Sequence, residues 1–213
     1  MITIALAKGR LAEETMTLLE KLGIDCSEPR SPGRKLVLTD KTGEYSFILV
    51  KPSDVPTYVY HGVADIGVAG KDTLMEQNKP ICEVLDLGFG RCKLAIAGKP
   101  EMRDKQNTSG SWRVATKYPQ IARRFYGGRG QTIEIIKLNG SVELGPLVGL
   151  SHVILDIVES GSTLRANGLE VFEDVCEVSA RLVVNEVSLK TKQAEIRPLI
   201  DRISELTKER EEK

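Results

Sequence analysis

Residues 154–169 (ILDIVESGSTLRANGL) bring together side chains that suit both ends of a sugar phosphate. Asp156 and Glu159 end an apolar run, where carboxylates can accept hydrogen bonds from ribose hydroxyls. A turn and the start of a short helix follow, where hydroxyl and N–H groups can surround a phosphate dianion: Ser160, Gly161, Ser162, Thr163 and Leu164. The segment therefore predicts a site for a phosphorylated ribose. The alternative is an ordinary turn whose hydroxyl groups only cap the helix.

A second candidate anion site lies where the first strand pattern turns into the first helix. Lys8, Gly9 and Arg10 occupy this turn, so two cations stand beside N–H groups that already favour an anion. Lys51 ends another predicted strand, at residues 45–50, where its ammonium group could face a ligand or water. The turn predicts a polyphosphate site, and solvated loop cations are the alternative.

Residues 64–72 (ADIGVAGKD) repeat the arrangement of a short strand followed by polar residues that open a helix. Asp65, Gly67 and Gly70 are its candidate binding residues, because glycine permits a close backbone approach to an anion. The alternative is that both glycines serve only packing and a turn. Further along, Ser141 is expected to cap a helix near residues 142–149, with Glu143 close to the positive helix end.

Short apolar runs alternate with helical patterns between these segments, which is typical of an α/β fold with mostly parallel sheets. Strands are expected at residues 3–7, 35–38, 45–50, 66–68, 92–97, 113–116, 134–137 and 152–157, and helices from about 12, at 55–60, at 119–127 and from about 195. A long apolar strand that follows Arg91 indicates a crossing into a second lobe, and the β-branched run at 175–184 indicates the return. The predicted domains are lobe I, at 1–90 plus 176–213, and lobe II, at 91–175, which carries the sugar-phosphate loop. Two crossings predict a hinged cleft.

The composition of the 213 residues narrows the class of protein. Lys and Arg number 30, as do Asp and Glu, so no global field would hold nucleic acid or an acidic membrane. No run reaches the roughly 18 apolar residues that span a bilayer, and no signal segment is present, so we expect a soluble cytoplasmic protein. Two histidines and four scattered cysteines argue against a zinc site or a disulfide framework, and Cys92 and Cys176 are expected in buried strands.

Six motifs resemble, in order and spacing, the short form of ATP phosphoribosyltransferase: LAKGR, KPSDVPTYV, GVADIGVAGKD, RVATKYP, KLNGSVELGP and DIVESGSTLRANGL. The resemblance covers nearly the whole chain, and the last two motifs together are the most specific. It implies a two-lobed α/β fold similar to the type II periplasmic binding proteins, with an active-site cleft between the lobes. This agrees with the two crossings expected from the sequence pattern.

The resemblance also implies the first step of histidine biosynthesis, in which N1 of the adenine of ATP attacks C1 of phosphoribosyl pyrophosphate and pyrophosphate leaves. Magnesium (Mg²⁺) accompanies the pyrophosphate, and no direct metal ligand is expected. Such a displacement needs positioning and charge stabilisation rather than a protein nucleophile. By matching motif positions, Asp156 and Glu159 would face the ribose, and the loop from Ser160 to Leu164 would hold the 5-phosphate. Catalytic charge stabilisation would come from Lys8, Arg10 and Lys51. Further residues of the cleft would bind ATP or pyrophosphate: Gly9, Asp65, Gly67, Gly70 and Glu143.

Two features distinguish this chain within the family. Some relatives carry arginine where Lys51 stands, and lysine cannot make the same bidentate contact. The chain also ends after a helix expected at 195–213, where the long form continues into a regulatory domain. Short forms are associated with a histidyl-tRNA-synthetase-like regulatory subunit, so the resemblance implies a homodimer within a hetero-oligomer.

Three other classes of protein stay open at this point. A non-enzymatic clamshell that binds a small anion would suit two lobes, although no signal peptide is present. A ligand-sensing domain of a transcription regulator would need a helix-turn-helix segment, which the sequence does not contain. A conventional phosphoribosyltransferase would explain the loop at 154–169, but it would not predict the LAKGR and GVADIGVAGKD segments.

Overall fold

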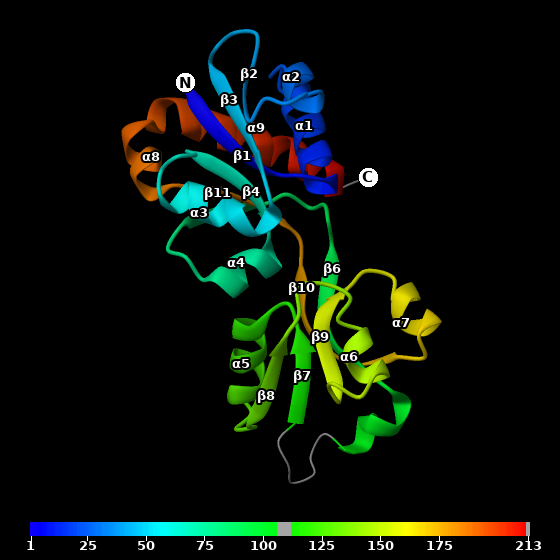
Figure 1. Ribbon diagram of the computed structural model, residues 1–213. Helices are drawn as coiled ribbons and strands as arrows, with labels where there is room; N and C mark the ends of the chain where they lie inside the picture. Colours follow the sequence, from blue (N-terminus) through cyan, green and yellow to red (C-terminus); the bar gives the residue numbers. More distant parts are fainter. Residues whose placement is uncertain (106–111, 212–213) are drawn as a thin grey trace. The chain divides into compact units, whose positions relative to one another are not determined.

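The computed structural model describes residues 1–105 and 112–211, and the chain forms two compact units (Figure 1). Unit 1 comprises Met1–Gly90 and Ser179–Lys213, and unit 2 comprises Arg91–Val178. The chain therefore passes from one unit to the other twice. Each unit is built around a sheet of its own.

Unit 1 alternates strands and helices along the chain. Before the first passage it contains β1 (Ile2–Ala7), α1 (Arg10–Lys21), α2 (Ser27–Arg30), β2 (Val37–Thr39), β3 (Tyr45–Val50), the 3₁₀ helix η1 (Pro52–Asp54), α3 (Val55–Tyr60), β4 (Ile66–Gly70), α4 (Lys71–Gln77) and β5 (Cys82–Asp86). After the return it contains β11 (Ala180–Val184), α8 (Glu186–Thr191) and α9 (Gln193–Glu211). The strand expected at 45–50 and the helix expected at 55–60 are confirmed, whereas the sequence pattern does not reveal β5 or α8.

The sheet of unit 1 is mixed, in the order β2-β3-β1-β4-β11-β5. β1 is parallel to both of its neighbours, β3 and β4, and the other pairs are antiparallel. The α/β class is confirmed, but the sheet is mixed where mostly parallel strands were expected. A hairpin joins β2 to β3, and β11 enters from unit 2, so neither connection is the helical crossover that parallel neighbours require.

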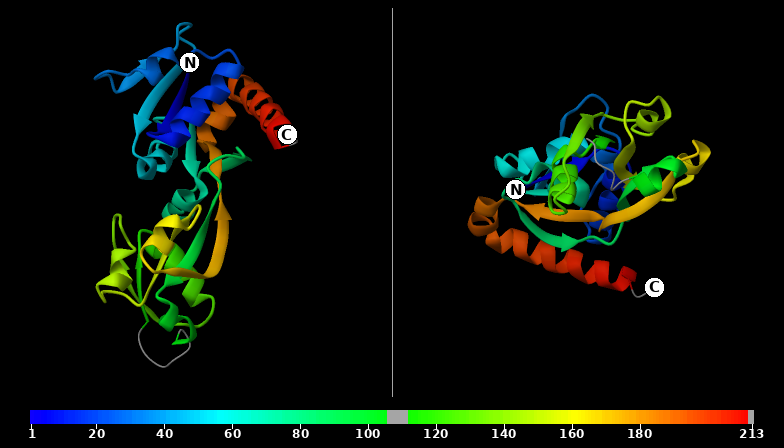
Figure 2. Two further views of the ribbon diagram at one scale, coloured as in Figure 1. Left: turned by 90° about the vertical axis from the view of Figure 1, so that its right-hand side faces the viewer. Right: turned by 90° about the horizontal axis from the view of Figure 1, so that it is seen from below.

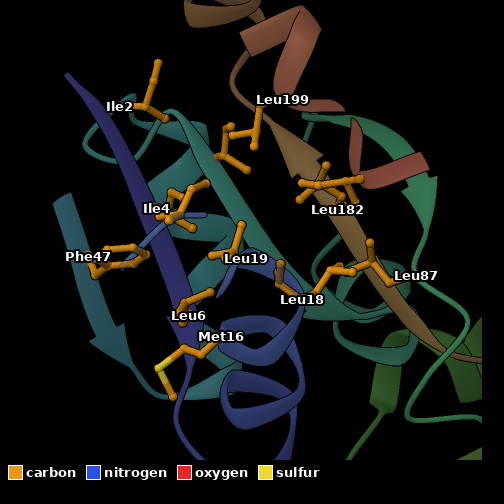
Figure 3. Packing of buried hydrophobic residues seen from close by; sticks show 14 of the residues in the cluster. Ile2, Ile4, Leu6, Met16, Leu18, Leu19, Phe47, Leu87, Leu182 and Leu199 are labelled. Atoms are coloured by element: carbon orange, nitrogen blue, oxygen red, sulfur yellow. The ribbon is translucent and has the colours of Figure 1, made fainter. Parts of the chain in front are cut away.

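Alternation along β1 divides its side chains between two hydrophobic cores. Figure 3 shows Ile4 and Leu6 in the larger core, where α1 contributes Met16, Leu18 and Leu19 and α9 contributes Leu199. Ala5 and Ala7 face the other side of the sheet, where Val55 and Val59 of α3 pack against them. Both faces of the sheet are therefore covered, as is typical where parallel strands form its centre.

The last helix, α9, is straight and long, and Pro198 lies inside it (Figure 2). Its apolar side chains Ile196, Leu199, Ile200 and Ile203 are buried, and Leu206 is half-buried. A proline inside a helix costs about 3 kcal/mol, and burial of each large aliphatic side chain returns about 1.5–3 kcal/mol. The helix begins two residues before the expected start at 195, and residues 212–213 of the expected helix lie outside the described residues.

Unit 2 contains β6 (Cys92–Gly98), η2 (Pro100–Lys105), β7 (Trp112–Thr116), α5 (Pro119–Gly127), β8 (Ile133–Lys137), α6 (Leu144–Leu147), β9 (Val153–Val158), α7 (Ser162–Ala166) and β10 (Glu170–Val178). Its sheet is also mixed, in the order β10-β6-β9-β7-β8, with β7 parallel to β8 and β9. Cys92 and Cys176 lie on the antiparallel pair β6 and β10 and are half-buried. Within residues 1–105 and 112–211, no helix is long and apolar enough to cross a membrane.

The β-branched run at residues 175–184 is two strands rather than one. β10 ends in unit 2 and β11 begins in unit 1, with Ser179 between them. The Ser179 hydroxyl donates a hydrogen bond to Asp86 Oδ1 at 2.8 Å, and its carbonyl oxygen accepts one from the N–H of Lys71 at 2.9 Å. These bonds satisfy buried polar groups at the break, which composition alone does not reveal.

Asp65 is a buried carboxylate that ties three segments of unit 1 together. Its Oδ2 accepts hydrogen bonds from the N–H of Thr3 at 2.9 Å and from Lys192 Nζ at 2.8 Å. Its Oδ1 accepts one from Ser188 Oγ at 2.6 Å. Burial by itself raises the pKa of Asp65, but these hydrogen bonds together hold that pKa below its ordinary value. The ionised carboxylate therefore stabilises the fold near neutral pH.

We predict that Asp65→Asn lowers the free energy of unfolding at pH 7 by about 1–3 kcal/mol, because hydrogen bonds to a charged group are lost. The folded-state pKa lies below the unfolded one, so the carboxylate's contribution is present above the unfolded pKa and is lost as pH falls through the folded pKa. Urea denaturation at neutral and acidic pH measures this, and the difference from the parent should shrink on acidification. Asp201→Asn, at an exposed position of α9, is the matched control. Equal stability of Asp65→Asn and parent would contradict a structural role.

The single tryptophan of the chain, Trp112, stacks on His152 with ring centroids 4.7 Å apart and an interplanar angle of 20°. The backbone N–H of Arg113 donates a hydrogen bond to His152 Nδ1 at 2.9 Å, so Nδ1 is the unprotonated nitrogen. Partial burial, and then the charge of Arg113, lower the pKa of His152 from its ordinary value of 6.5, against an opposite effect of Glu134. The neutral imidazole is thus part of the unit 2 fold.

Acidification is expected to quench the fluorescence of Trp112 with a midpoint below pH 6.5, because a stacked imidazolium quenches indole emission. Since the folded-state pKa is lowered, the stability that neutral His152 contributes is present above pH 6.5 and is lost as pH falls through the folded-state pKa. A fluorescence titration checks the midpoint. His152→Gln should abolish the transition and His61→Gln, in unit 1, should retain it. A midpoint at or above pH 6.5 would be inconsistent with the lowered pKa.

Candidate functional site

A pocket of about 270 Å³ lies in unit 2 at the carboxyl end of β9. The binding residues expected within the segment 154–169 all line it: Asp156, Glu159, Ser160, Gly161, Ser162, Thr163 and Leu164. The other lining residues are Glu143, Ile154, Ile157 and Val158. The three apolar residues were not anticipated, because a continuous apolar strand does not indicate which side chains will face a ligand.

The end of β9 is open on one side. β9 pairs with β6 along its whole length, but with β7 only from Val153 to Leu155. Asp156 is the first residue beyond the β7 pairing and is half-buried, while the preceding residues are fully buried. The buried part of the strand anchors the carboxylate, and the missing β7 partner leaves room for a ligand beside it.

The turn after β9 depends on Gly161, which has φ 69° and ψ 9° and precedes the first residue of α7. This left-handed conformation is costly for residues with a Cβ atom. No side chain caps α7. The Ser160 hydroxyl donates a hydrogen bond to Ser162 Oγ at 3.0 Å, and the N–H of Ser162 reaches Ser160 Oγ only at 3.4 Å. The hydroxyl groups of this turn therefore do not serve merely as helix caps.

Glu143 enters the same pocket from the turn before α6. The expectation that Ser141 caps this helix is wrong: Ser141 has φ 48°, no side chain caps α6, and the helix begins only at Leu144. Residues 141–144 form a turn instead, in which the N–H of Leu144 donates a hydrogen bond to the carbonyl oxygen of Ser141 at 3.1 Å. Glu143 ends this turn, directly before α6, and lines the pocket with the loop after β9.

A row of cations lies at the carboxyl edge of the unit 1 sheet. β1 and β3 are parallel with Ala7 opposite Val50, so Lys8 and Lys51 leave the sheet side by side. The N–H of Lys8 donates a hydrogen bond to the carbonyl oxygen of Val50 at 2.9 Å, and the Lys8 and Lys51 side chains are exposed. Gly9, with φ 108° and ψ −155°, turns the chain into α1, whose first residue is the exposed Arg10. Gly70, at the end of β4, reaches the same edge.

Two residues expected in the site serve the fold instead. Asp65 precedes β4, at the opposite end of that strand from Gly70 and about 16 Å away along it. Its carboxylate is held by Thr3, Ser188 and Lys192. Gly67 lies in the middle of β4, where a Cβ atom would meet Val59 at 2.6 Å and Val55 at 2.8 Å. Both expectations are therefore corrected, and the packing alternative holds for Gly67.

The two sets of residues suit different chemical groups. In unit 2 three carboxylates, Glu143, Asp156 and Glu159, share a pocket with a hydroxyl-bearing turn, which suits the hydroxyls and the phosphate of a ribose phosphate. In unit 1 the cation edge suits a polyphosphate. Within the part of the chain that the structure describes, no group of three or more His, Cys, Asp or Glu side chains is placed to hold a metal ion.

A family model described as ATP phosphoribosyltransferase matches residues 51–205. The chain is 56% identical over 207 residues to the ATP phosphoribosyltransferase of Alkaliphilus metalliredigens, covering 97% of this chain and 98% of that protein. It is 53% identical over 201 residues to the ATP phosphoribosyltransferase of Ruminiclostridium cellulolyticum, covering 94% of each.

Solved structures support the same grouping. A chain of the ATP phosphoribosyl transferase (HisG:HisZ) complex from Thermotoga maritima superimposes with a TM-score of 0.85 at 34% identity, covering 98% of both chains. The periplasmic aliphatic sulphonate binding protein SsuA from Escherichia coli gives a TM-score of 0.57 at 14% identity, covering 99% of this chain and 75% of that one. This second likeness confirms the periplasmic-binding-protein-like fold and gives no support to a non-enzymatic function. From the match over residues 51–205 and these identities, the chain belongs to the ATP phosphoribosyltransferase family.

Proposed function

We propose that the pocket of unit 2 binds the ribose phosphate of phosphoribosyl pyrophosphate while the chain condenses that substrate with ATP. The observation that carries the proposal is the gathering of the whole segment from Asp156 to Leu164 around one pocket, in a chain of this family. Asp156 and Glu159 accept hydrogen bonds from the ribose hydroxyls. The N–H and hydroxyl groups from Ser160 to Thr163 hold the 5-phosphate, with Leu164 closing the apolar base.

The reaction forms a bond between N1 of adenine and C1 of the ribose. The bond from C1 to the pyrophosphate oxygen breaks, and the electron pair leaves with pyrophosphate. Positive charge develops on the ribose ring and negative charge on the leaving group. Carboxylates therefore stabilise the charge on the ribose, and cations stabilise the charge on the pyrophosphate. Lys8, Arg10 and Lys51 of the unit 1 edge are the proposed cations for the leaving pyrophosphate or the ATP phosphates, with the exposed Gly9 and the strand end at Gly70 beside them.

Magnesium enters this proposal as part of the substrate, bound to the pyrophosphate group. Among the described residues, the carboxylates of the unit 2 pocket are not grouped as a metal site, so we assign the ligands of Mg²⁺ to the substrate. Hard oxygen ligands of the polyphosphate and water satisfy Mg²⁺ without a dedicated protein cage.

We also propose that the chain works as a homodimer within a hetero-oligomer that contains a histidyl-tRNA-synthetase-like regulatory subunit. The support is the likeness, at 34% identity over 98% of both chains, to a chain of the Thermotoga maritima complex of HisG with HisZ. Mixing the purified chain with such a subunit should give one species of higher mass in sedimentation analysis.

The activity itself is tested by supplying the purified chain and its regulatory subunit with ATP, phosphoribosyl pyrophosphate and magnesium. Phosphoribosyl-ATP and pyrophosphate should form in equal amounts, as measured by product absorbance and a pyrophosphate assay. Omission of either substrate is the control. If both proteins are folded and the complete mixture yields no product, the proposed function is wrong.

Asp156→Asn should weaken the binding of phosphoribosyl pyrophosphate by roughly 1–3 kcal/mol, because a charged acceptor for ribose hydroxyls is lost. Direct calorimetric titration measures the affinity. Asp174→Asn is the matched control, since Asp174 lies on β10 and pairs with Lys93 at 2.5 Å, outside the pocket. Unchanged affinity in Asp156→Asn would remove this residue from the site.

A further inference from the structure

Arg165 lies directly over the turn that forms the phosphate-binding part of the proposed site. It follows Gly161 by four residues on α7, and its N–H donates a hydrogen bond to the carbonyl oxygen of Gly161 at 3.0 Å. A Cβ atom on Gly161 would lie 3.0 Å from Arg165 Nη1 and 3.9 Å from Arg165 Cζ. The guanidinium group thus folds back over Gly161 instead of extending along the surface.

Nothing among the described residues holds the guanidinium group there. Five of the other arginines form ion pairs with carboxylates: Arg30, Arg103, Arg129, Arg181 and Arg210. Arg165 has neither an ion pair nor a side-chain hydrogen bond within residues 1–105 and 112–211, and its side chain is exposed. A cation placed beside the N–H groups of a turn is electrostatically unfavourable unless an anion lies between them.

We infer that Arg165 is a further substrate-binding residue, which closes over the 5-phosphate and selects phosphorylated ribose. The inference rests on the proposed function of the pocket. Arg165 is not among the residues that line the pocket, so it acts from the rim. Its planar guanidinium can give two parallel hydrogen bonds to phosphate oxygens while the turn holds the others. Gly161 then has two roles, since it adopts the positive φ and also leaves space for the guanidinium group.

The test compares Arg165→Gln and Arg165→Lys with Arg123→Gln, an exposed arginine of α5 that does not line the pocket. Arg165→Gln should raise the KM for phosphoribosyl pyrophosphate by roughly tenfold or more, because charge-assisted hydrogen bonds to phosphate are lost. The KM for ATP should stay within about twofold, and Arg165→Lys should fall between Gln and parent because it keeps only a point charge. Arg123→Gln should match the parent.

A second readout separates phosphate binding from a general effect on the loop. Ribose 5-phosphate and pyrophosphate are used as competitive inhibitors of the parent and of Arg165→Gln. The inhibition constant of ribose 5-phosphate should rise with the KM, and that of pyrophosphate should not change. An equal rise in both constants would overturn the inference in favour of a structural role. An unchanged KM in Arg165→Gln, with Asp156→Asn still impaired, would overturn it and leave the proposed pocket standing. Unchanged values in both variants would overturn the pocket as well.

Discussion

The register of the parallel strands β1, β3 and β4 is the constraint on which the rest of unit 1 depends. Because Ala7 lies opposite Val50, the residues that follow, Lys8 and Lys51, reach one sheet edge together. The same register sends Ile4 and Leu6 into the larger core and the alanines of β1 toward α3. A slip by one residue would exchange the two faces of a strand. One pairing therefore specifies both the core and the cation edge.

In unit 2, strand pairing likewise positions the polar residues of a pocket, but here they are carboxylates rather than cations. Asp156 lies where β9 continues beyond the last residue that pairs with β7. The turn at Gly161 follows the end of this strand. Ligands of α/β proteins commonly bind at the carboxyl ends of strands. Two anionic substrates repel each other in any shared site. The proposed function assigns sugar hydroxyls to the carboxylates of the unit 2 pocket and phosphate groups to the cations of the unit 1 edge.

Elements with strong local patterns were predictable from the sequence. The strand at 45–50 and the helix at 55–60 have the expected bounds, because a short apolar run and a proline near a helix start are local signals. α8 was missed because its start depends on Asn185, whose amide also donates to the carbonyl oxygen of Val59, far away in sequence. The break at Ser179 was missed because β-branched residues continue on both sides of it.

By itself the sequence determined which chemical groups are available and the order of strand, turn and helix around each of them, since these depend on neighbouring residues. It thereby predicted the composition of the loop after β9 and its use for a ribose phosphate. Only the tertiary structure decided that Glu143 joins that loop in one pocket and that Asp65 belongs to the fold. The reason is physical: the strand end at which a carboxylate lies, and the partners that take up its charge, are set by pairing between distant segments.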